Sequence, residues 1–306
     1  MKKQLDSQTI SKRTGERLGH IKNGSVVDNP WQTLRRYTDA RIGLGRAGIS
    51  LPTSAMLGFQ LSHAKARDAV KLRLDTELLS QQLQQQLGEF TVDFPHSPIV
   101  LHSQAFDRTS FLQRPDLGRK LNGASRNSLL NFMTQQEGDS EPEYDLAIVV
   151  ADGLSSLAVQ HNAVPFLKQF IARIHNEKRP ARLAPLTIIE QGRVAIGDEV
   201  GESLNAKAVL LLIGERPGLS SPDSLGVYFT WDPKVGVNDS QRNCISNIRP
   251  AGLGFDDAAQ RAMYLLTQAR RIKRSGIQLK DHSDYTSRDV LTQGGLPKRS
   301  FLTKPS

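Results

Sequence analysis

The chain has 306 residues, 38% of them hydrophobic and 23% charged, which provides enough apolar mass for a sizeable core and excludes global disorder. Its net charge of +9 belongs to the ends, because residues 1–50 hold ten Lys and Arg against four Asp and Glu, and residues 268–306 hold nine against three. No run approaches the roughly 18 apolar residues that span a bilayer, no secretory segment follows the basic N-terminus, and the single cysteine, Cys244, excludes an internal disulfide or a multi-cysteine zinc site.

The N-terminal third is predicted to be helical after a polar start. Residues 1–30 carry little periodicity and are predicted to form a flexible basic arm. Behind it, the segment 51–70 has apolar residues at helical spacing, and the segment 75–90 repeats leucine at i, i+4 and i+8 before Gly88. We therefore predict a helical N-terminal region over residues 31–97.

Residues 98–280 alternate between apolar runs and helical patterns. The runs are short, end at glycine or polar residues, and predict strands at 98–104, 146–150, 184–193, 208–215 and 225–231. Helical patterns, the second of them also compatible with a turn, occupy 162–178, 197–206 and 255–276. Continuously apolar strands that alternate with helices predict an α/β fold with a Rossmann-like, mainly parallel sheet and helices on both faces.

The end of the chain carries a helix and then a polar tail. The helix predicted at 255–276 matches the helix dipole, since Asp256 and Asp257 lie in its first turn and basic residues lie in its last. Gly276 is predicted to end this helix. Residues 281–306 are polar, contain a Gly-Gly pair and scattered prolines, and are predicted to form a flexible tail.

Polar residues follow three of the predicted strands, at Asp152–Gly153, at Glu190–Arg193 and at Gly214–Arg216. If these strands are parallel, all three polar ends meet at one edge of the sheet. Ligands of such sheets bind beyond the carboxyl ends of the strands. We therefore predict a ligand-binding edge formed by these three segments.

Several familiar motifs are absent. The letters GLGRAG at 43–48 satisfy a dinucleotide-binding pattern, but no buried strand precedes them and Pro52 stands where the helix should run, so we predict a glycine-rich turn. The letters GERPG at 214–218 lack the Gly-Lys-Ser/Thr of a phosphate-binding loop. The seven histidines show no metal-ligand spacing, and no Gly-x-Ser-x-Gly sequence occurs. The residues therefore predict a polar ligand edge without a metal site or a catalytic constellation.

Three residues at or near this edge allow two interpretations. Glu215 fits a strand-end carboxylate that pairs with Arg216 or with loop amides. Cys244 fits a small buried hydrophobe, and Val194 fits an ordinary packing residue. The pattern by itself leaves both this structural interpretation and a ligand-binding role open.

Five longer motifs favour a ligand-binding role over the purely structural interpretation. They are TDARIGLGRAG, QRPDLGRKL, VVADGLSS, GRVAIGDEVGESLNAKAVLLLIGERPGL and RNCISNI. In this order and spacing, they resemble the small subunit of ethanolamine ammonia-lyase over residues 31–279. The resemblance implies one subunit of an adenosylcobalamin-dependent lyase that converts ethanolamine to acetaldehyde and ammonia. It also implies a partner, a large TIM-barrel subunit that binds ethanolamine and carries the radical chemistry while the small subunit covers the cofactor.

The resemblance also implies the cofactor contacts. The positions that the family assigns to cobalamin match Val194, Glu215 and Cys244, and no catalytic residue or metal ligand is implied in this chain. Val194 and Cys244 would offer apolar contact to the corrin, and Glu215 would accept hydrogen bonds from its amides or hydroxyls. The chain has no Asp-x-His-x-x-Gly, the pattern with which some corrinoid enzymes supply a histidine to cobalt.

The expected location is the cytoplasm. Many members of the family carry a longer N-terminal extension that addresses them to a bacterial microcompartment, and the basic arm here is shorter, so the microcompartment is the alternative. We expect neither a nucleic acid nor a membrane as partner. Two other functions stay open on the residues alone: a stand-alone α/β module that binds a nucleotide or phosphate, and a scaffold or nucleic-acid adaptor that uses the basic ends.

Overall fold

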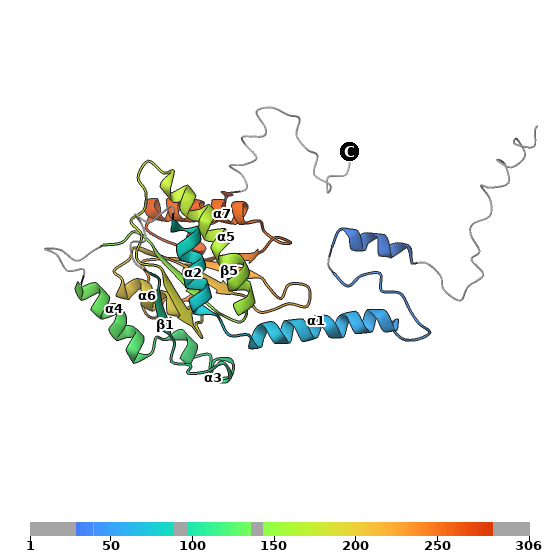
Figure 1. Cartoon of the computed structure of the whole chain (residues 1–306). Helices are drawn as coiled ribbons and strands as arrows, with labels where there is room; N and C mark the ends of the chain where they lie inside the picture. The colour runs from blue at the N-terminus through green and yellow to red at the C-terminus, as the bar shows by residue number, and fades with distance from the viewer. Residues whose placement is uncertain (1–28, 39, 89–96, 136–142, 284–306) are drawn as a thin grey trace, which may run out of the picture. The chain divides into compact units, whose positions relative to one another are not determined.

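A computed structural model of the chain describes residues 29–38, 40–88, 97–135 and 143–283 (Figure 1). The predicted arm at 1–30 and tail at 281–306 lie almost entirely outside these residues and stay predictions. The chain divides into two compact units at Gln60 and Leu61, and each is described by itself.

The first unit contains little regular structure. A 3-10 helix, η1 (Pro30–Arg36), begins behind Asn29, whose side chain accepts a hydrogen bond from the Trp31 amide at 3.1 Å. The glycine-rich stretch 43–48 follows without a strand before it among the described residues, in line with the predicted turn. The helix α1 (Thr53–Lys71) begins in this unit and continues into the second.

The second unit is built on a six-stranded sheet with the order β1-β3-β2-β4-β5-β6. Its strands are β1 (Ile99–His102), β2 (Ala147–Ala151), β3 (Thr187–Glu190), β4 (Ala208–Gly214), β5 (Leu225–Trp231) and β6 (Arg242–Ile248). The first four strands are parallel, whereas β5 pairs antiparallel with β4, and β6 pairs antiparallel with β5. The sheet is therefore mixed, and the predicted parallel arrangement holds for four strands only.

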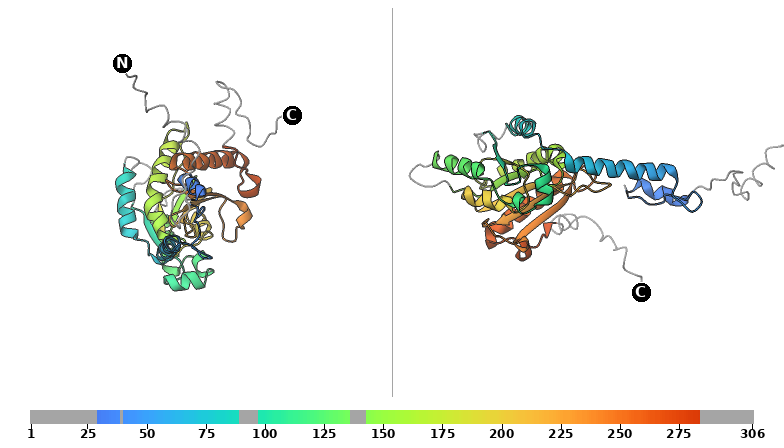
Figure 2. Two further views of the ribbon diagram at one scale, coloured as in Figure 1. Left: turned by 90° about the vertical axis from the view of Figure 1, so that its right-hand side faces the viewer. Right: turned by 90° about the horizontal axis from the view of Figure 1, so that it is seen from below.

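Helices cover both faces of this sheet (Figures 1 and 2). The helices α2 (Thr76–Gln86), α5 (Ser156–His175) and α7 (Phe255–Ile272) pack on one face. The helices α4 (Gly123–Gln135) and α6 (Ile196–Ser203) pack on the other. Continuous apolar strands such as β4, all seven of whose residues are buried, need this cover on both sides.

The longest core helix begins earlier than its pattern predicts. α5 starts at Ser156, because the Ser155 hydroxyl accepts a hydrogen bond from the Ala158 amide at 3.2 Å and caps the first turn. Its buried face includes Phe166 and Phe170, whose rings stack at 5.8 Å between centroids. This face joins α5 to the sheet and to α7.

The last helix ends earlier than predicted. α7 stops at Ile272, and Lys273 adopts a left-handed conformation with φ of 55°. Gly276, which we predicted as the end of this helix, instead has φ of 68° and begins the 3-10 turn η5 (Gly276–Gln278). The reason is a close approach, since a Cβ at Gly276 would lie 2.0 Å from the Ser240 carbonyl oxygen.

Two α-helices and one strand of the described residues were not predicted. They are α3 (Arg108–Gln113), α4 and the strand β6. β6 lacks an apolar run because one of its faces is exposed, and its pairing with β5 gives it the extended conformation. It adds the last antiparallel strand beside the predicted ligand edge.

Candidate functional site

The carboxyl ends of the parallel strands lie together, and we call this region the carboxyl edge. β2 is followed by Asp152, β3 by Gln191 and β4 by Glu215. Asp152 Oδ1 accepts a hydrogen bond from the Gly192 amide at 2.9 Å, which joins the ends of β2 and β3 directly. The structure thus confirms that the polar strand ends meet at one edge.

A buried arginine holds this edge together. Arg108, the first residue of α3, is only 7% exposed. Its Nη1 lies 2.8 Å from the Gly153 carbonyl oxygen, 3.3 Å from Gln191 Oε1 and 3.4 Å from Asp152 Oδ2. Sequence reasoning missed Arg108, because these three partners lie 44 or more residues away along the chain.

Two glycines allow the loop after β2 to touch the end of β4. A Cβ at Gly214 would lie 2.0 Å from the Ser155 carbonyl oxygen, closer than any side chain tolerates. Gly153 has φ of 58°, and a Cβ there would lie 2.3 Å from the Gly214 carbonyl oxygen. Side chains at these positions would push the β2 and β4 ends apart and open the carboxyl edge.

Glu215 connects β4 to both antiparallel strands. Its Oε2 accepts hydrogen bonds from the Ser224 hydroxyl and, at 3.3 Å, from the Asn247 amide, and its Oε1 accepts one from the Ser246 hydroxyl. Gly226 leaves the space for this side chain, since a Cβ there would lie 2.9 Å from Glu215 Oε1. Glu215 therefore has the structural contacts of a strand-end carboxylate, although they lie with β5 and β6 and not with Arg216.

Cys244 lies exposed in the middle of β6, directly opposite Tyr228 of β5. We call the surface of β5 and β6 that carries Tyr228, Cys244 and Ser246 the Cys244 face. Desolvation raises the pKa of Cys244, the hydrogen bond with Tyr228 lowers it, and the charge of Glu215 raises it, with a net shift upward. The thiol is therefore neutral at physiological pH, and the expectation of a buried cysteine is wrong.

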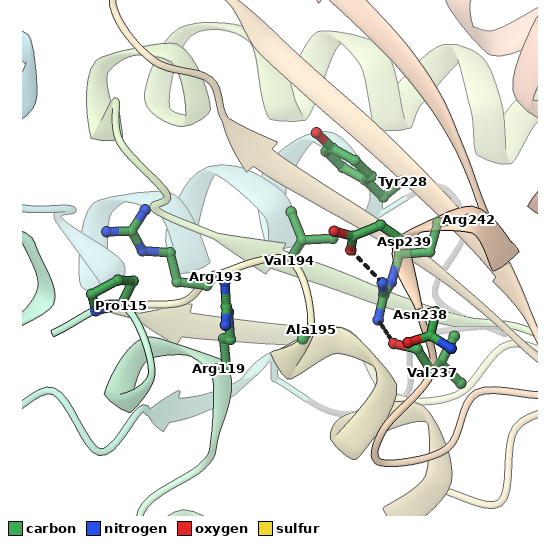
Figure 3. Close-up of a pocket in the computed structure, with 10 residues that line it drawn as sticks. All are labelled: Pro115, Arg119, Arg193, Val194, Ala195, Tyr228, Val237, Asn238, Asp239 and Arg242. Atoms are coloured by element: carbon green, nitrogen blue, oxygen red, sulfur yellow. Dashed lines mark hydrogen bonds and ion pairs between the residues drawn. The ribbon is translucent and has the colours of Figure 1, made fainter.

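Val194 lies in the connection between β3 and α6, half-buried against the same core cluster as Tyr228. It lines a cavity of about 610 Å³ together with Tyr228 and Arg242 (Figure 3). The structure therefore brings all three predicted residues to one side of the sheet. Glu215 accepts a hydrogen bond from Ser246 of β6, Cys244 lies opposite Tyr228, and Val194 lines the same cavity as Tyr228. Tyr228 itself was missed, because its place opposite Cys244 depends on the β5–β6 register.

Asp152 should give the fold a measurable dependence on pH. Burial raises its pKa from 3.8 to about 6, against the opposing effect of Arg108. A carboxyl whose folded pKa is raised holds its proton more tightly in the native state, so its contribution to stability falls as pH rises from about 4 to about 6, by up to about 3 kcal/mol. The free energy of unfolding of the wild type minus that of Asp152→Asn is expected to fall over this range in urea titrations.

A second carboxyl supplies the control for this experiment. At Asp145 burial raises the pKa, but hydrogen bonds from the Arg182 amide and Lys207 outweigh it, and the pKa is lowered. The corresponding difference for Asp145→Asn should therefore rise with pH, as this carboxylate's contribution is lost only at low pH. A difference for Asp152→Asn that is flat or rises between pH 4 and 6 would contradict the assignment.

The described residues contain no group of three or more His, Cys, Asp or Glu arranged to hold a metal ion. No helix in the described ranges has the length and apolarity that crossing a bilayer requires. The chemistry that the site offers within these ranges is carboxylates, one neutral thiol, a phenol, apolar contact and guanidinium groups.

Comparison with known proteins places these features in a family. A sequence model described as the ethanolamine ammonia-lyase light chain matches residues 28–280. The chain is 51% identical over 266 residues to the ethanolamine ammonia-lyase small subunit of Pseudomonas syringae pv. tomato, covering 87% of this chain and 88% of that one. It is 50% identical to the proteins of the same description from Pseudomonas fluorescens and Ralstonia nicotianae, over 90% and 91% of this chain and 96% of each of theirs.

Proposed function

The chain belongs to the ethanolamine ammonia-lyase small-subunit (light-chain) family, a subunit of a lyase that acts on ethanolamine, and from this we propose that it forms one side of an adenosylcobalamin site completed by the large subunit. One observation carries the proposal. Of the three residues that match the family's cobalamin positions, Val194 lines a cavity with Tyr228, Cys244 lies opposite Tyr228, and Glu215 accepts a hydrogen bond from Ser246 of the Cys244 face.

The volume of the cavity fits a cobalamin site that is shared between two subunits. Small-molecule sites usually measure roughly 300–1,000 Å³ and bury most of their ligand. The cavity of about 610 Å³ therefore suits one part of a corrinoid and leaves its broad ring to be covered elsewhere. Tyr228 lines this cavity, and Cys244 opposite it and Ser246 are exposed, so a second polypeptide has a surface to contact.

Each residue of this chain then has a physical task. Val194 and the neutral thiol of Cys244 offer apolar contact. Desolvation raises the pKa of Tyr228, with further upward shifts from Cys244 and Glu215, so that its hydroxyl stays protonated and can donate a hydrogen bond. A carboxylate can accept about four hydrogen bonds. Glu215 accepts three from the protein, so one acceptor position remains for an amide or hydroxyl of the ligand.

The division of labour follows from this chemistry. Bound adenosylcobalamin supplies the radical chemistry through its cobalt–carbon bond. This chain orients the cofactor and excludes water on one side, which protects reactive species from side reactions. We assign no catalytic residue to this chain, and ethanolamine binds mainly to the large subunit.

Reconstitution tests the proposal. Purified chain and large subunit are mixed with adenosylcobalamin, and corrin absorbance after gel filtration measures retained cofactor while acetaldehyde release measures turnover. We expect retention and turnover only when both polypeptides are present. A large subunit that retains the cofactor and turns over ethanolamine equally well alone would overturn the proposal.

The large subunit also has a candidate contact on α1 and on the residues that precede it. None of the described residues between 29 and 60 is buried, and large apolar side chains there are exposed, among them Trp31 (66%) and Tyr37 (85%). On α1, Leu57 and Leu61 are each 57% exposed and lie one turn apart. Apolar surface of this extent on a subunit marks a protein interface.

Negative charge at Leu57 and Leu61 should prevent assembly with the large subunit without unfolding the chain. The double variant Leu57→Glu/Leu61→Glu is expected to bind the large subunit at least tenfold more weakly, since interface anchors carry most of the binding energy. Its melting temperature should stay near that of the wild type, because exposed substitutions usually change stability by at most about 0.5 kcal/mol. Gln60→Glu, an exposed polar position on the same helix, is the control, and equal binding by both variants would contradict the assignment.

Two finer points belong to the same proposal. The four parallel strands with helices on both faces support a Rossmann-like classification of the second unit. We propose the cytoplasm as the location, with the microcompartment as the alternative. Fractionation of cells grown on ethanolamine decides between them.

A further inference from the structure

One end of the cavity beside Val194 is strongly basic. Arg119 and Arg193 line it with Pro115, and Figure 3 shows these three on the opposite side of Val194 from Arg242 and Asp239. In the ranges that the structure describes, neither Arg119 nor Arg193 forms an ion pair with a carboxylate. This end of the cavity therefore carries positive charge that the protein itself does not neutralise.

The two arginines are placed by different means. The Arg193 amide donates to the Gly118 carbonyl at 2.7 Å, and a Cβ at Gly118 would lie 2.7 Å from Arg193 Cγ, so the two loops touch. The Arg193 guanidinium stacks 4.2 Å from the Phe111 ring centroid and donates one hydrogen bond, at 2.9 Å, to the Phe111 carbonyl. Arg119 extends from the neighbouring 3-10 turn η3 (Leu117–Arg119) with an exposed side chain that makes no hydrogen bond within the described chain.

The positive charge is concentrated. Burial is the largest effect that lowers the pKa of Arg193; Arg108, Arg119 and Arg216 lower it further, and Asp152 raises it. Arg108 is paired with Asp152 at 3.4 Å, whereas the guanidinium groups of Arg119, Arg193 and Arg216 repel one another unless an anion joins them. At the other end of the cavity, Asp239 is already paired with Arg242 at 2.6 Å and does not offset the arginines.

We propose that Arg119 and Arg193 bind a phosphate group at this end of the cavity, and that in the assembled enzyme this is the phosphodiester of the cofactor's nucleotide tail. Guanidinium groups match phosphate oxygens in geometry and charge. Arg193 has used one of its five N–H donors in a hydrogen bond and Arg119 has used none, so both have donors to give. Val194 between the two ends would then lie against the apolar part of the same ligand.

This inference rests on the proposed function for the identity of the ligand, and the experiment separates the two. The assembled enzyme is titrated with adenosylcobalamin and with adenosylcobinamide, which lacks the nucleotide tail and its phosphodiester, and corrin absorbance gives each dissociation constant. Arg119→Gln is the main variant, because its side chain makes no contact that holds the fold. Arg114→Gln is the matched control, an exposed arginine five residues earlier that pairs with Asp116.

We expect Arg119→Gln and Arg193→Gln to weaken adenosylcobalamin binding at least tenfold and adenosylcobinamide binding less than twofold. Arg119→Lys should recover part of the affinity, and Arg114→Gln should change neither. Equal losses for the two ligands, or no loss for either, would overturn the inference while leaving the cobalamin site in place.

Inorganic phosphate supplies an arm that does not depend on cobalamin. If the wild-type assembly retains neither corrinoid, the proposed function fails, and calorimetric titration of the chain with phosphate tests the cavity by itself. Phosphate binding that is lost in Arg119→Gln and kept in Arg114→Gln supports a phosphate site. No binding by the wild-type chain, or equal binding by all three proteins, overturns it.

Discussion

Replacement of Glu215 by alanine is expected to weaken adenosylcobalamin binding to the assembled enzyme by about tenfold to a hundredfold, the usual worth of a hydrogen bond to a charged acceptor. The alanine removes the acceptor position that remains for the ligand. It also removes the three hydrogen bonds that join the end of β4 to Ser224, Ser246 and Asn247. Corrin absorbance titration of the assembled complex measures the loss. We expect assembly with the large subunit to be unchanged, because Glu215 follows β4 and is not part of the exposed apolar surface at Leu57 and Leu61.

Two neighbouring variants separate binding from structure. Ser246→Ala removes one internal hydrogen bond of Glu215 and leaves its charge, so it should change cobalamin affinity less than threefold. Glu215→Gln keeps the shape and loses the charge, and should give an intermediate affinity. Unchanged affinity in Glu215→Ala would mean that this carboxylate serves the fold only.

Replacement of Arg242 by methionine is expected to lower the free energy of unfolding by about 3–5 kcal/mol, the usual cost of leaving one partner of a buried ion pair alone. Arg242 is 8% exposed and Asp198 is 2% exposed, and the two side chains are paired. Arg242 also donates to the Val237 carbonyl at 2.7 Å. Without the arginine, the Asp198 carboxylate remains buried, and burial already raises its pKa.

The comparison with an exposed ion pair makes this test specific. Lys234 and Asp232 are paired at 3.0 Å with side chains 62% and 67% exposed, so Lys234→Met should cost at most about 1 kcal/mol. Adding Asp198→Leu to Arg242→Met should recover part of the loss, because no buried charge is then left unpaired. Urea denaturation at pH 7 measures all three, and an Arg242→Met protein as stable as Lys234→Met would contradict the buried-pair argument.

The predicted edge and the structure agree for a local reason. Asp152, Gln191 and Glu215 each follow a short apolar run, and the three runs are parallel strands whose carboxyl ends share one edge. Their meeting therefore follows from strand direction alone. Membership of the ethanolamine ammonia-lyase small-subunit family was likewise predicted from linear motifs and is confirmed by the family match over residues 28–280.

The errors have long-range causes. β6 has exposed side chains at Cys244 and Ser246, so its sequence contains no apolar run that would predict a strand. Its pairing with β5 gives it the extended conformation. Gly276 was taken for a helix end, but it is required where the chain passes within contact of Ser240. In each case the deciding neighbour lies more than ten residues away.

The sequence by itself determined the α/β class, the strand ends that carry polar residues and the family, because these depend on local periodicity and on linear motifs. The cobalamin contacts Val194, Glu215 and Cys244 follow from the same motifs and stay a prediction. Only the tertiary structure decided that β5 and β6 run antiparallel, that Arg108 is buried behind Asp152, and that Arg119 and Arg193 share a cavity with Val194. The physical reason is that hydrogen-bond pairing, ion pairing and cavity walls join side chains tens of residues apart, and no local pattern encodes which of them will meet.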